Sequence, residues 1–364
     1  MPRRILLACP QRIGDVLLAT PLARSLKRAW PQAEVAMLVF QGTEGVLAGN
    51  PDIAEVIVVP RRTDLAARAA ELRALWRRYD LALAPLATDR ARIYCWAAGR
   101  RRVGLVNPGF KDLAKTLLLN QSLGFDDLDT HTVAMGLSLA GLLGIAPCYD
   151  VVPPAIAPAC LDSLLARLGP LAGNPFAVLH VYPNFAYKMW PPAAWIALAQ
   201  SLQQRGLGVA FTGGPEGAER AYVDAIARAL PDRPRTLDLA GTLTLGATAE
   251  LIRRARLYVG PDTAVTHIAA ATGTPTVALF GPSNPVKWGP WPRGWAGSTS
   301  PWQRRGSQRQ GNVMLLQGPG DCVPCMLEGC QRNIWSGSEC LENLSARSVI
   351  AAAEALLSDA APVP

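Results

Sequence analysis

The sequence predicts an α/β protein with two doubly wound parallel sheets. The chain has 364 residues, 50% of them hydrophobic and only 18% charged, which is a globular composition and a length that suits two domains. Short apolar runs alternate with stretches of helical spacing, and this alternation stops once and then restarts. Alternating strands and helices are typical of a parallel sheet with helices on both faces.

The first half carries the pattern up to about residue 106. GDVLLATPLARSLKRAW at 14–30 has helical spacing and follows the first apolar run. The apolar runs around it are short and several are bounded by Pro, which favours strands over helices. We expect strands in RILLAC at 4–9, EVAMLVF at 34–40, VIVVP at 56–60, LALAP at 81–85 and RRVGLV at 101–106.

The pattern stops at GIAPCYDVVPPAIAPAC, residues 144–160, which is rich in Pro and lacks periodicity. We interpret this stretch as a linker, with a hinge near 150–172. Strand-like runs then return, and Rossmann-like alternation resumes. The expected strands are FAVLHV at 176–181, GVAFTG at 208–213, TLDLAG at 236–241, RLYVG at 256–260 and TVALFG at 276–281.

We therefore expect an N-terminal domain over 1–160 and a C-terminal domain over 161–343, the latter ending in a Cys-rich segment at 320–342. Residues 290–313 are polar, basic and Trp-containing without periodicity, so we expect a long loop there. An Ala-rich helix with Ser345 as its N-cap is expected within 344–364, packed back on the N-terminal domain.

The formal net charge is +8, and Arg residues are clustered. Such clusters meet anionic lipid headgroups or a phosphorylated glycan, or else form a solvated surface. No nucleic-acid-binding motif accompanies them, so nucleic acid is not an expected partner. The clusters are Arg61–Arg62, Arg77–Arg78, Arg100–Arg102 and Arg304–Arg305.

The sequence shows no membrane-spanning segment, because no apolar run reaches the roughly 18–20 residues that a bilayer requires. The N-terminal apolar run breaks at 10–12 and no cleavage site of small residues follows, so it is interpreted as a first strand and not a signal peptide. These observations favour a cytoplasmic protein.

Ligands of open α/β sheets bind beyond the carboxyl ends of the strands, so the residues that follow each strand are the candidates for chemistry. Gly14–Asp15 follows the first strand at the mouth of a helix. Gly permits a tight turn and close approach of a ligand. Asp15 fits either a helix cap or a general base, and the residues alone leave both open.

Three strand-to-helix junctions in the second half suit phosphate. Lys188 precedes a helix that begins near Pro191–Pro192, where a cation and free helix amides meet an anion well. Thr212 and Gly213 leave the backbone open to close approach, and Glu216 fits either a ribose hydroxyl pair or a favourable charge at a helix start.

The third junction lies in YVGPDTAVTHIAAAT, which begins at Tyr258. Asp262 is the expected N-cap, and Thr263 and Ala264 then present first-turn amides to an anion. His267 is placed to reach a phosphate or a sugar, or to pack under the loop. Three such junctions favour a nucleotide with more than one phosphate. Neither a Walker A loop nor a G-x-G-x-x-G after a strand is present, which argues against an NTPase and a dehydrogenase.

These segments together resemble glycosyltransferase family nine, the ADP-heptose:lipopolysaccharide heptosyltransferases, over nearly the whole chain. The resemblance implies the GT-B fold, in which two Rossmann-like domains face each other across a cleft. The segments that carry it are RIGDVLLATPLARSLKRAWPQAEV, YKMWPPAAWIALA, FTGGPEGAE and AGTLTLGATAELIRRARLYVGPDTAVTHIAAATGTPTVALFGPSNP.

The resemblance implies an inverting transfer of heptose from ADP-heptose to an inner-core lipopolysaccharide sugar, with no cofactor in catalysis, at the inner face of the inner membrane. It makes Asp15 the general base, with Arg12 and Gly14 on the acceptor side. Lys188 binds the donor diphosphate. The other implied donor contacts are Thr212, Gly213, Glu216 at the ribose, Leu243 at the adenine, Asp262 at the heptose hydroxyls, the amides of Thr263, Ala264 and Val265, and His267 near the phosphates.

Two alternatives stay open at this point. One is a GT-B transferase that uses another nucleotide sugar for a different glycan or protein acceptor. The other is a GT-B-like binding protein without activity. The identity of the donor nucleotide tests the first alternative. Loss of activity on changing Asp15 tests the second, because a binding protein has no activity to lose.

The chain has eight cysteines, of which four are clustered near its end. We expect the scattered four, Cys9, Cys95, Cys148 and Cys160, to be buried free thiols. The clustered four have the spacing C-x2-C-x4-C-x9-C, which suits a structural zinc or iron–sulfur site, reduced thiols, or two disulfides. They are Cys322, Cys325, Cys330 and Cys340.

Overall fold

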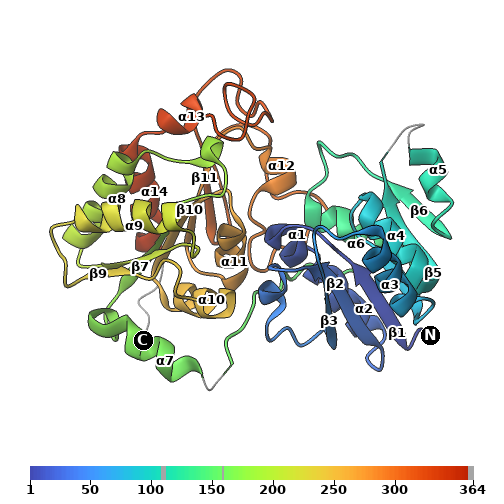
Figure 1. Cartoon of the computed structure of the whole chain (residues 1–364). Coiled ribbons are helices and arrows are strands. Elements are labelled where there is room, and N and C mark those ends of the chain that lie inside the picture. Colours follow the sequence, from blue (N-terminus) through green and yellow to red (C-terminus); the bar gives the residue numbers. More distant parts are fainter. Residues whose placement is uncertain (108–111, 158–159, 360–364) are drawn as a thin grey trace. The chain divides into compact units, whose positions relative to one another are not determined.

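The computed structural model describes residues 1–107, 112–157 and 160–359, and it contains two parallel sheets with helices around them (Figure 1). Each sheet belongs to its own compact unit. This architecture confirms the predicted α/β class with two doubly wound domains.

The chain passes between the two units more than once. Unit 1 comprises Met1–Pro154 and Gly294–Ser300, and unit 2 comprises Ala155–Arg293 and Pro301–Pro364. The first crossing lies inside the Pro-rich linker. The other two lie in the long loop, because a seven-residue stretch of that loop is part of unit 1.

Unit 1 holds a six-stranded sheet in the order β3-β2-β1-β4-β5-β6, with every pair parallel. Its strands are β1 (Arg4–Ala8), β2 (Glu34–Phe40), β3 (Glu55–Val59), β4 (Tyr79–Ala84), β5 (Gly99–Val106) and β6 (Gln121–Gly124). Its helices are α1 (Ile13–Leu18), α2 (Thr20–Ala29), α3 (Leu65–Leu75), α4 (Asp89–Ala98), α5 (Leu113–Thr116) and α6 (Thr132–Leu142), with a 3-10 turn η1 (Glu44–Leu47).

The central strand β1 explains why the first apolar run folds as it does. Ile5 lies beside Val35 of β2 and Leu81 of β4, and all three are buried. Leu6 and Ala8 point to the opposite face and join the core cluster under α3 and α4. A strand covered on both faces is apolar at every position, which is the run seen in the sequence.

Unit 2 holds a seven-stranded sheet in the order β12-β13-β11-β10-β7-β8-β9. All pairs are parallel except β12 with β13. Its strands are β7 (Phe176–His180), β8 (Gly208–Thr212), β9 (Thr236–Asp238), β10 (Leu257–Pro261), β11 (Thr276–Phe280), β12 (Gln308–Gln310) and β13 (Val313–Gln317).

The helices of unit 2 cover both faces of this sheet. In Figure 1, α8, α9 and α14 lie on one face and α10 and α11 on the other. The helices are α7 (Leu161–Leu168), α8 (Pro192–Gln204), α9 (Gly217–Arg228), α10 (Leu245–Arg254), α11 (Ala264–Thr272), α12 (Pro285–Trp288), α13 (Glu339–Glu342) and α14 (Ala346–Asp359), with 3-10 turns η4 (Gly169–Leu171) and η5 (Ala186–Lys188).

The expected loop at 290–313 is more ordered than its sequence predicts. It contains β12 and the first residue of β13, and Trp291 and Trp302 within it are buried. Trp302 packs in a cluster with Phe280 and Leu315 and donates from Nε1 to the Pro290 carbonyl at 3.1 Å. Single Trp anchors and a three-residue strand give no periodicity, so the sequence pattern could not reveal this order.

The position of the terminal helix differs from the expectation. Ser345 accepts a hydrogen bond from the Ser348 amide at 3.1 Å, as a cap should. However, α14 packs on the core of its own unit, unit 2. Val349, Ala353 and Leu356 join the core cluster of α8 and the second sheet. The Trp190 indole, also in that cluster, donates to the Leu344 carbonyl at 2.8 Å and fixes the approach to the helix.

No helix in the described ranges is long and apolar enough to cross a bilayer.

Replacing Leu356 by Ala tests the placement of α14. Leu356 is fully buried, so we expect the free energy of unfolding of unit 2 to fall by about 2–5 kcal/mol. Hydrogen exchange should accelerate in α8, β10 and β11 and stay unchanged in β1 and β4. Leu357→Ala is the matched control, because Leu357 is only partly buried against the same core and should cost less. Faster exchange in unit 1 alone would contradict the placement.

Candidate functional site

The carboxyl ends of three adjacent strands bring together a polar cluster in unit 2. Strands β11, β10 and β7 are neighbours, so the residues that follow them meet at one edge of the sheet. Lys188, after β7, lies 2.5 Å from the Asp262 Oδ2 atom, after β10, and its Nζ also donates to the Asp262 carbonyl at 3.2 Å. The Lys188 side chain is 17% exposed and that of Asp262 9%, so the ion pair is largely withdrawn from water.

Ser283, after β11, completes this cluster, and sequence reasoning did not find it. Its hydroxyl donates to the same Asp262 Oδ2 atom at 2.6 Å. Burial acts to raise the pKa of Asp262, but Lys188 and the Ser283 hydrogen bond outweigh it and the pKa is lowered. Among the described residues, Oδ1 has no hydrogen-bond donor, which leaves one carboxylate oxygen open.

Helix α11 starts directly beside this carboxylate. Thr263 is its N-cap, with φ −139° and ψ 167°, and the expected role of Asp262 as the cap is therefore wrong. The Asp262 side chain pairs with Lys188 and Ser283, and the Thr263 side chain makes no capping bond. The amides of Ala264 and Val265 belong to the first turn, where a helix offers them no carbonyl acceptor. A helix start in this state attracts an anion.

Gly260 is required by the packing behind this helix start. A Cβ at that position would lie 2.3 Å from the Tyr258 hydroxyl and 3.0 Å from Thr266 Oγ1. Thr266 in turn donates to the Pro261 carbonyl at 2.5 Å and lies 3.0 Å from the Tyr258 hydroxyl. These bonds fix the turn that orients the first amides of α11.

His267 lies near the same helix start and has an unusual environment. It is 6% exposed, and its Nδ1 atom has no hydrogen-bond partner among the described residues. Burial lowers its pKa to about 4, although the Asp262 charge acts to raise it. His267 is therefore neutral at pH 7, and its Nδ1 atom is a buried polar group without a hydrogen-bond partner among the described residues.

A second buried histidine lies where β7 and β8 end. His180, the last residue of β7, has its Nδ1 atom 3.2 Å from the hydroxyl of Thr212, the last residue of β8. Burial lowers the His180 pKa to about 4, so this ring is also neutral. The Thr212 hydroxyl thus already has a protein partner, His180. Its assignment as a donor contact stays a prediction.

Glu219 occupies the Gly213–Gly214 turn, and sequence reasoning did not single it out. A Cβ on Gly214 would lie 2.7 Å from Glu219 Oε2, so the carboxylate sits on the turn itself. Burial raises the Glu219 pKa, although a hydrogen bond from the Gly214 backbone acts in the opposite direction. Glu216, by contrast, is an exposed N-cap of α9 whose side chain makes no capping bond. Leu243, before α10, is partly buried.

Unit 1 places its candidate residues at the carboxyl end of β1. Asp15 lies in the first turn of α1, whose N-cap is Arg12, so Asp15 is not the cap itself. Asp15 and Gly14 are partly buried and Arg12 is exposed. Beneath them the Cys9 thiol is fully buried, and burial together with the Asp15 charge raises its pKa. Cys9 therefore stays a neutral thiol at physiological pH.

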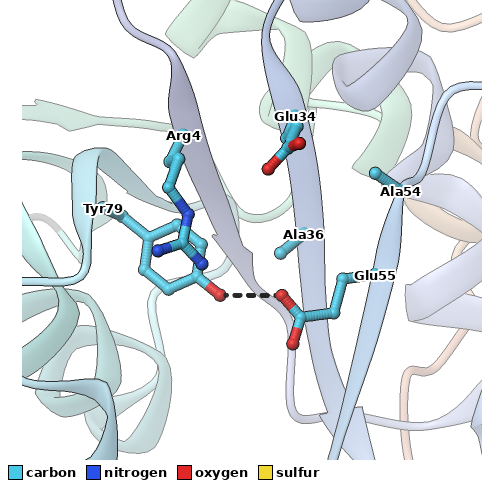
Figure 2. Close-up of a pocket in the computed structure, with 6 residues that line it drawn as sticks. All are labelled: Arg4, Glu34, Ala36, Ala54, Glu55 and Tyr79. Carbon is cyan, nitrogen blue, oxygen red and sulfur yellow. Dashed lines mark hydrogen bonds between the residues drawn. The ribbon is translucent and has the colours of Figure 1, made fainter.

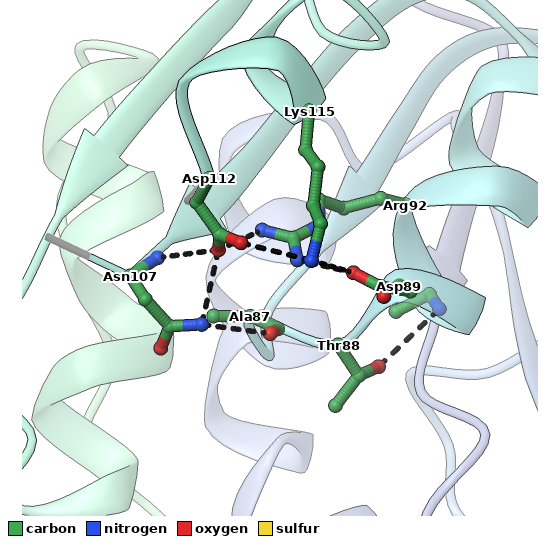
Figure 3. A network of polar contacts seen from close by, with 8 residues as sticks. Ala87, Thr88, Asp89, Arg92, Asn107, Asp112 and Lys115 are labelled. Carbon is green, nitrogen blue, oxygen red and sulfur yellow. Dashed lines mark hydrogen bonds and ion pairs between the residues drawn. The ribbon is translucent and has the colours of Figure 1, made fainter. Parts of the chain in front are cut away.

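A buried ion network lies beyond the carboxyl ends of β4 and β5 in unit 1 (Figure 3). Arg92 is 1% exposed and binds both Asp112 and Asp89 at 2.7 Å. Lys115 bridges the same two carboxylates at 3.0 and 2.8 Å. Asn107 donates to Asp112 from its backbone and its side chain. The network ties the end of β5 to the start of α4.

A hollow of about 150 Å³ lies at the opposite, amino edge of the same sheet (Figure 2). Arg4 lies over the Tyr79 ring at 5.0 Å, and the Tyr79 hydroxyl donates to Glu55 at 3.4 Å. Glu34 and Glu55 make the hollow unsuitable for a phosphate. The ligands of such sheets bind at the other edge, so this hollow is not the site.

The four clustered cysteines line one hollow of about 210 Å³ together with Pro282, which precedes Ser283. Burial, followed by the charges of Cys325, Cys330 and Cys322, raises the pKa of Cys340 to about 11. All four are free thiols. In the described ranges no three His, Cys, Asp or Glu side chains are arranged to hold a metal, so the geometry lends no support to the expected zinc or iron–sulfur site.

The scattered cysteines follow the expectation in part. Cys9, Cys95 and Cys148 are buried free thiols. Cys160 is exposed, which corrects the expectation for that residue. It directly precedes α7 at the end of the Pro-rich linker, where no sheet covers it.

The fold and the site together define a class of protein with two Rossmann-like sheets. A cation and a free helix start lie at the carboxyl edge of the second sheet. The family model for glycosyltransferase family 9 (heptosyltransferase) matches residues 130–318. Lipopolysaccharide heptosyltransferase 3 of Escherichia coli K12 is 30% identical over 312 residues, 78% of this chain and 86% of that protein. The chain therefore belongs to glycosyltransferase family 9, and it is a glycosyltransferase.

Solved structures agree in fold. The Escherichia coli ADP-heptose lipopolysaccharide heptosyltransferase II has a TM-score of 0.74 at 20% identity, with 98% of each chain covered. The Escherichia coli heptosyltransferase WaaC, solved with ADP, has a TM-score of 0.71 at 20% identity, with 97% of this chain and 99% of that chain covered. These likenesses confirm the predicted GT-B fold.

Replacing Asp112 by Asn tests the network in unit 1. Hydrogen bonds from Arg92 and Lys115 hold the Asp112 pKa below its ordinary value of 3.8. A lowered folded-state pKa contributes stability above the ordinary value and loses it as the pH falls through the folded value. At pH 7 the free energy of unfolding of the variant should be about 3 kcal/mol lower than that of the wild type. The buried Arg92 keeps its charge but loses one of its two carboxylate partners.

Hydrogen exchange in β4 and β5 measures this loss. Between pH 5 and pH 2 the wild type should lose protection more steeply than the variant. Asp150→Asn is the control, because its ion pair with Arg28 at 3.6 Å is exposed and should contribute little. Equal effects of the two substitutions would contradict the role assigned to the network.

Proposed function

We propose that this enzyme transfers heptose from ADP-heptose to a sugar of the inner core of lipopolysaccharide, with inversion at the anomeric carbon. The observation that supports it most is the Lys188–Asp262 pair beside the open start of α11, in a chain of this family. The relative named above acts on lipopolysaccharide, and WaaC was solved with ADP.

In this proposal unit 2 binds the donor. Lys188 and the amides of Thr263, Ala264 and Val265 bind the diphosphate, and His267 lies near the phosphates. A diphosphate leaves with its negative charge, so preorganised positive potential lowers the barrier to departure. Asp262 accepts from heptose hydroxyls through its open Oδ1 atom.

The nucleoside contacts are less closely defined by geometry. We propose that Leu243 lies against the adenine and that Glu216 accepts from the ribose hydroxyls. Both follow strands or precede helices at the carboxyl edge, and the exposed Glu216 side chain is not engaged in capping. Thr212 and Gly213 line the same edge between β8 and α9.

Asp15 is the proposed general base. Its carboxylate takes the proton from the acceptor hydroxyl as that oxygen bonds to the anomeric carbon, while the bond from that carbon to the diphosphate oxygen breaks. A partly buried Asp in the first turn of α1 is held firmly by the helix, which favours a fixed geometry. Arg12 and Gly14 form the acceptor side of this turn.

Basic residues of unit 1 support an anionic acceptor. Arg61 and Arg90 both lie over the Phe40 ring, at 5.3 and 5.0 Å, at the carboxyl ends of β2 and β3. Two guanidinium groups held on one ring form a fixed positive surface. We propose that such surfaces meet acceptor phosphates and anionic lipid at the cytoplasmic face of the inner membrane.

Titration calorimetry with ADP, UDP and GDP tests the donor assignment. We expect selective binding of ADP, and a loss of about tenfold or more in affinity for Lys188→Ala, because a charged hydrogen-bond donor to phosphate is removed. Arg228→Ala, which breaks only an exposed ion pair with Asp224, is the matched control. A preference for UDP or GDP would show that the enzyme uses another nucleotide sugar as its donor. Binding of none of the three nucleotides would favour a GT-B-like protein without transferase activity.

Asp15→Asn tests the general base. Transfer to a truncated lipopolysaccharide acceptor should fall by about 10²–10⁴, since the amide cannot take a proton. ADP affinity should not change, because the proposed nucleotide contacts all lie in unit 2. Asp150→Asn serves as the control for charge in unit 1. Full activity of Asp15→Asn would eliminate it as the base.

A further inference from the structure

The Lys188–Asp262 ion pair places the proposed phosphate-binding cation in contact with a protein carboxylate. Lys188 Nζ makes both of its hydrogen bonds to Asp262, at 2.5 Å to Oδ2 and 3.2 Å to the carbonyl. A diphosphate that binds at the start of α11 attracts the Lys188 ammonium group and so weakens its ion pair with Asp262. The phosphate and the Asp262 carboxylate therefore compete for one cation.

The competition leaves a carboxylate behind. When Lys188 turns to the diphosphate, Asp262 loses the only lysine or arginine that pairs with it among the described residues. The Asp262 side chain is only 9% exposed, so water replaces little of this lost interaction. It also lies near the anionic diphosphate, so the two negative charges repel each other. A buried anion without a partner is costly unless hydrogen bonds replace the lost charge.

Two sources of hydrogen bonds can stabilise the released carboxylate. Ser283 donates to Oδ2 at 2.6 Å and does not depend on Lys188. The hydroxyls of a sugar attached to the nucleotide can donate to Oδ1. A nucleotide sugar supplies both a phosphate for Lys188 and hydroxyls for Asp262, whereas a free nucleotide supplies only the phosphate.

We propose that the Asp262–Ser283 pair discriminates the nucleotide sugar from the free nucleoside diphosphate, and so favours release of that product after transfer. Asp262 weakens the binding of the diphosphate alone, and Ser283 limits this effect by holding the released carboxylate. Ser283 is thus a positioning residue that acts through Asp262. This inference rests on the proposed function, because it requires a diphosphate at Lys188.

The position of Ser283 is itself braced by the Cys-rich segment. The Met326 amide donates to the Pro282 carbonyl at 2.8 Å. A Cβ on Gly281 would lie 2.8 Å from Leu341 and 3.0 Å from the Cys340 thiol. The same segment reaches the Lys188 turn, where the Ala186 amide donates to the Ile334 carbonyl at 3.1 Å. The turns of Lys188 and Ser283 therefore share one support.

Calorimetry with ADP and with ADP-heptose, in the absence of acceptor, tests the proposal on Asp262→Asn, Ser283→Ala and Ser283→Thr. Asp262→Asn should bind ADP more tightly than the wild type, by at least about fivefold, because the competing charge is gone. Its preference for ADP-heptose over ADP should shrink. Ser283→Ala should bind ADP about threefold more weakly, and Ser283→Thr, which keeps the hydroxyl, should match the wild type.

Asp224→Asn is the control, since it removes one exposed negative charge from the same unit. Circular dichroism and melting temperature check that each variant is folded. If Asp262→Asn does not fold, the comparison of Ser283→Ala with Ser283→Thr still decides: equal ADP affinity of these two variants would overturn the proposal. ADP binding to folded Asp262→Asn that is equal to or weaker than that of the wild type would overturn the proposal. A wild type that binds no ADP would instead overturn the proposed function, and this inference with it.

Discussion

The arrangement of this protein depends on the burial of parallel strands on both faces. Every residue of β8, β10 and β11 is buried, so the interior of these strands is almost entirely apolar. Polar groups are tolerated where the strands end and the chain turns into a helix. Neighbouring parallel strands end at the same edge, and this geometry brings Lys188, Asp262 and Ser283 together from segments far apart in the sequence. The site is a consequence of how the sheet excludes polarity from its interior.

This constraint explains why much of the fold could be predicted from the sequence. The central strands appear as short continuous apolar runs, and their ends appear as Gly, Asp, Thr and Lys at the turns. Lys188 and Asp262 could be singled out by position alone, because each follows a strand and precedes a helix. Among the edge strands, β6, β9 and β12 are short, and β6 and β12 have few apolar residues, so they carry little of this signal. The expectation found β9 within the run TLDLAG and missed β6, β12 and the inner strand β13.

The parts that could not be predicted depend on contacts between distant residues. A lone Ser after β11 gives no sign that it donates to a carboxylate 21 positions earlier. Glu219 resembles an ordinary acidic residue in a first turn, and only the structure shows its carboxylate on the Gly213–Gly214 turn. The amphipathic α14 carries a face to bury, but nothing in its sequence says which sheet receives it. Asp262 was assigned to capping because a helix start usually recruits the nearest acid, and here the buried cation holds it more strongly.

The return of residues 294–300 to unit 1 has a consequence for recombining this fold with its relatives. The alternation of strands and helices predicts two consecutive halves joined once, yet the backbone changes unit at three places. A chimaera cut only at Pro154 would take six strands from one parent and the seven-residue excursion from the other. Residues 294–300 would then pack against a unit 1 from the other parent. The segments on either side of them would stay with unit 2, where Trp291 and Trp302 are buried. Grafting unit 1 from a relative thus requires a discontinuous segment, transplanted as two pieces.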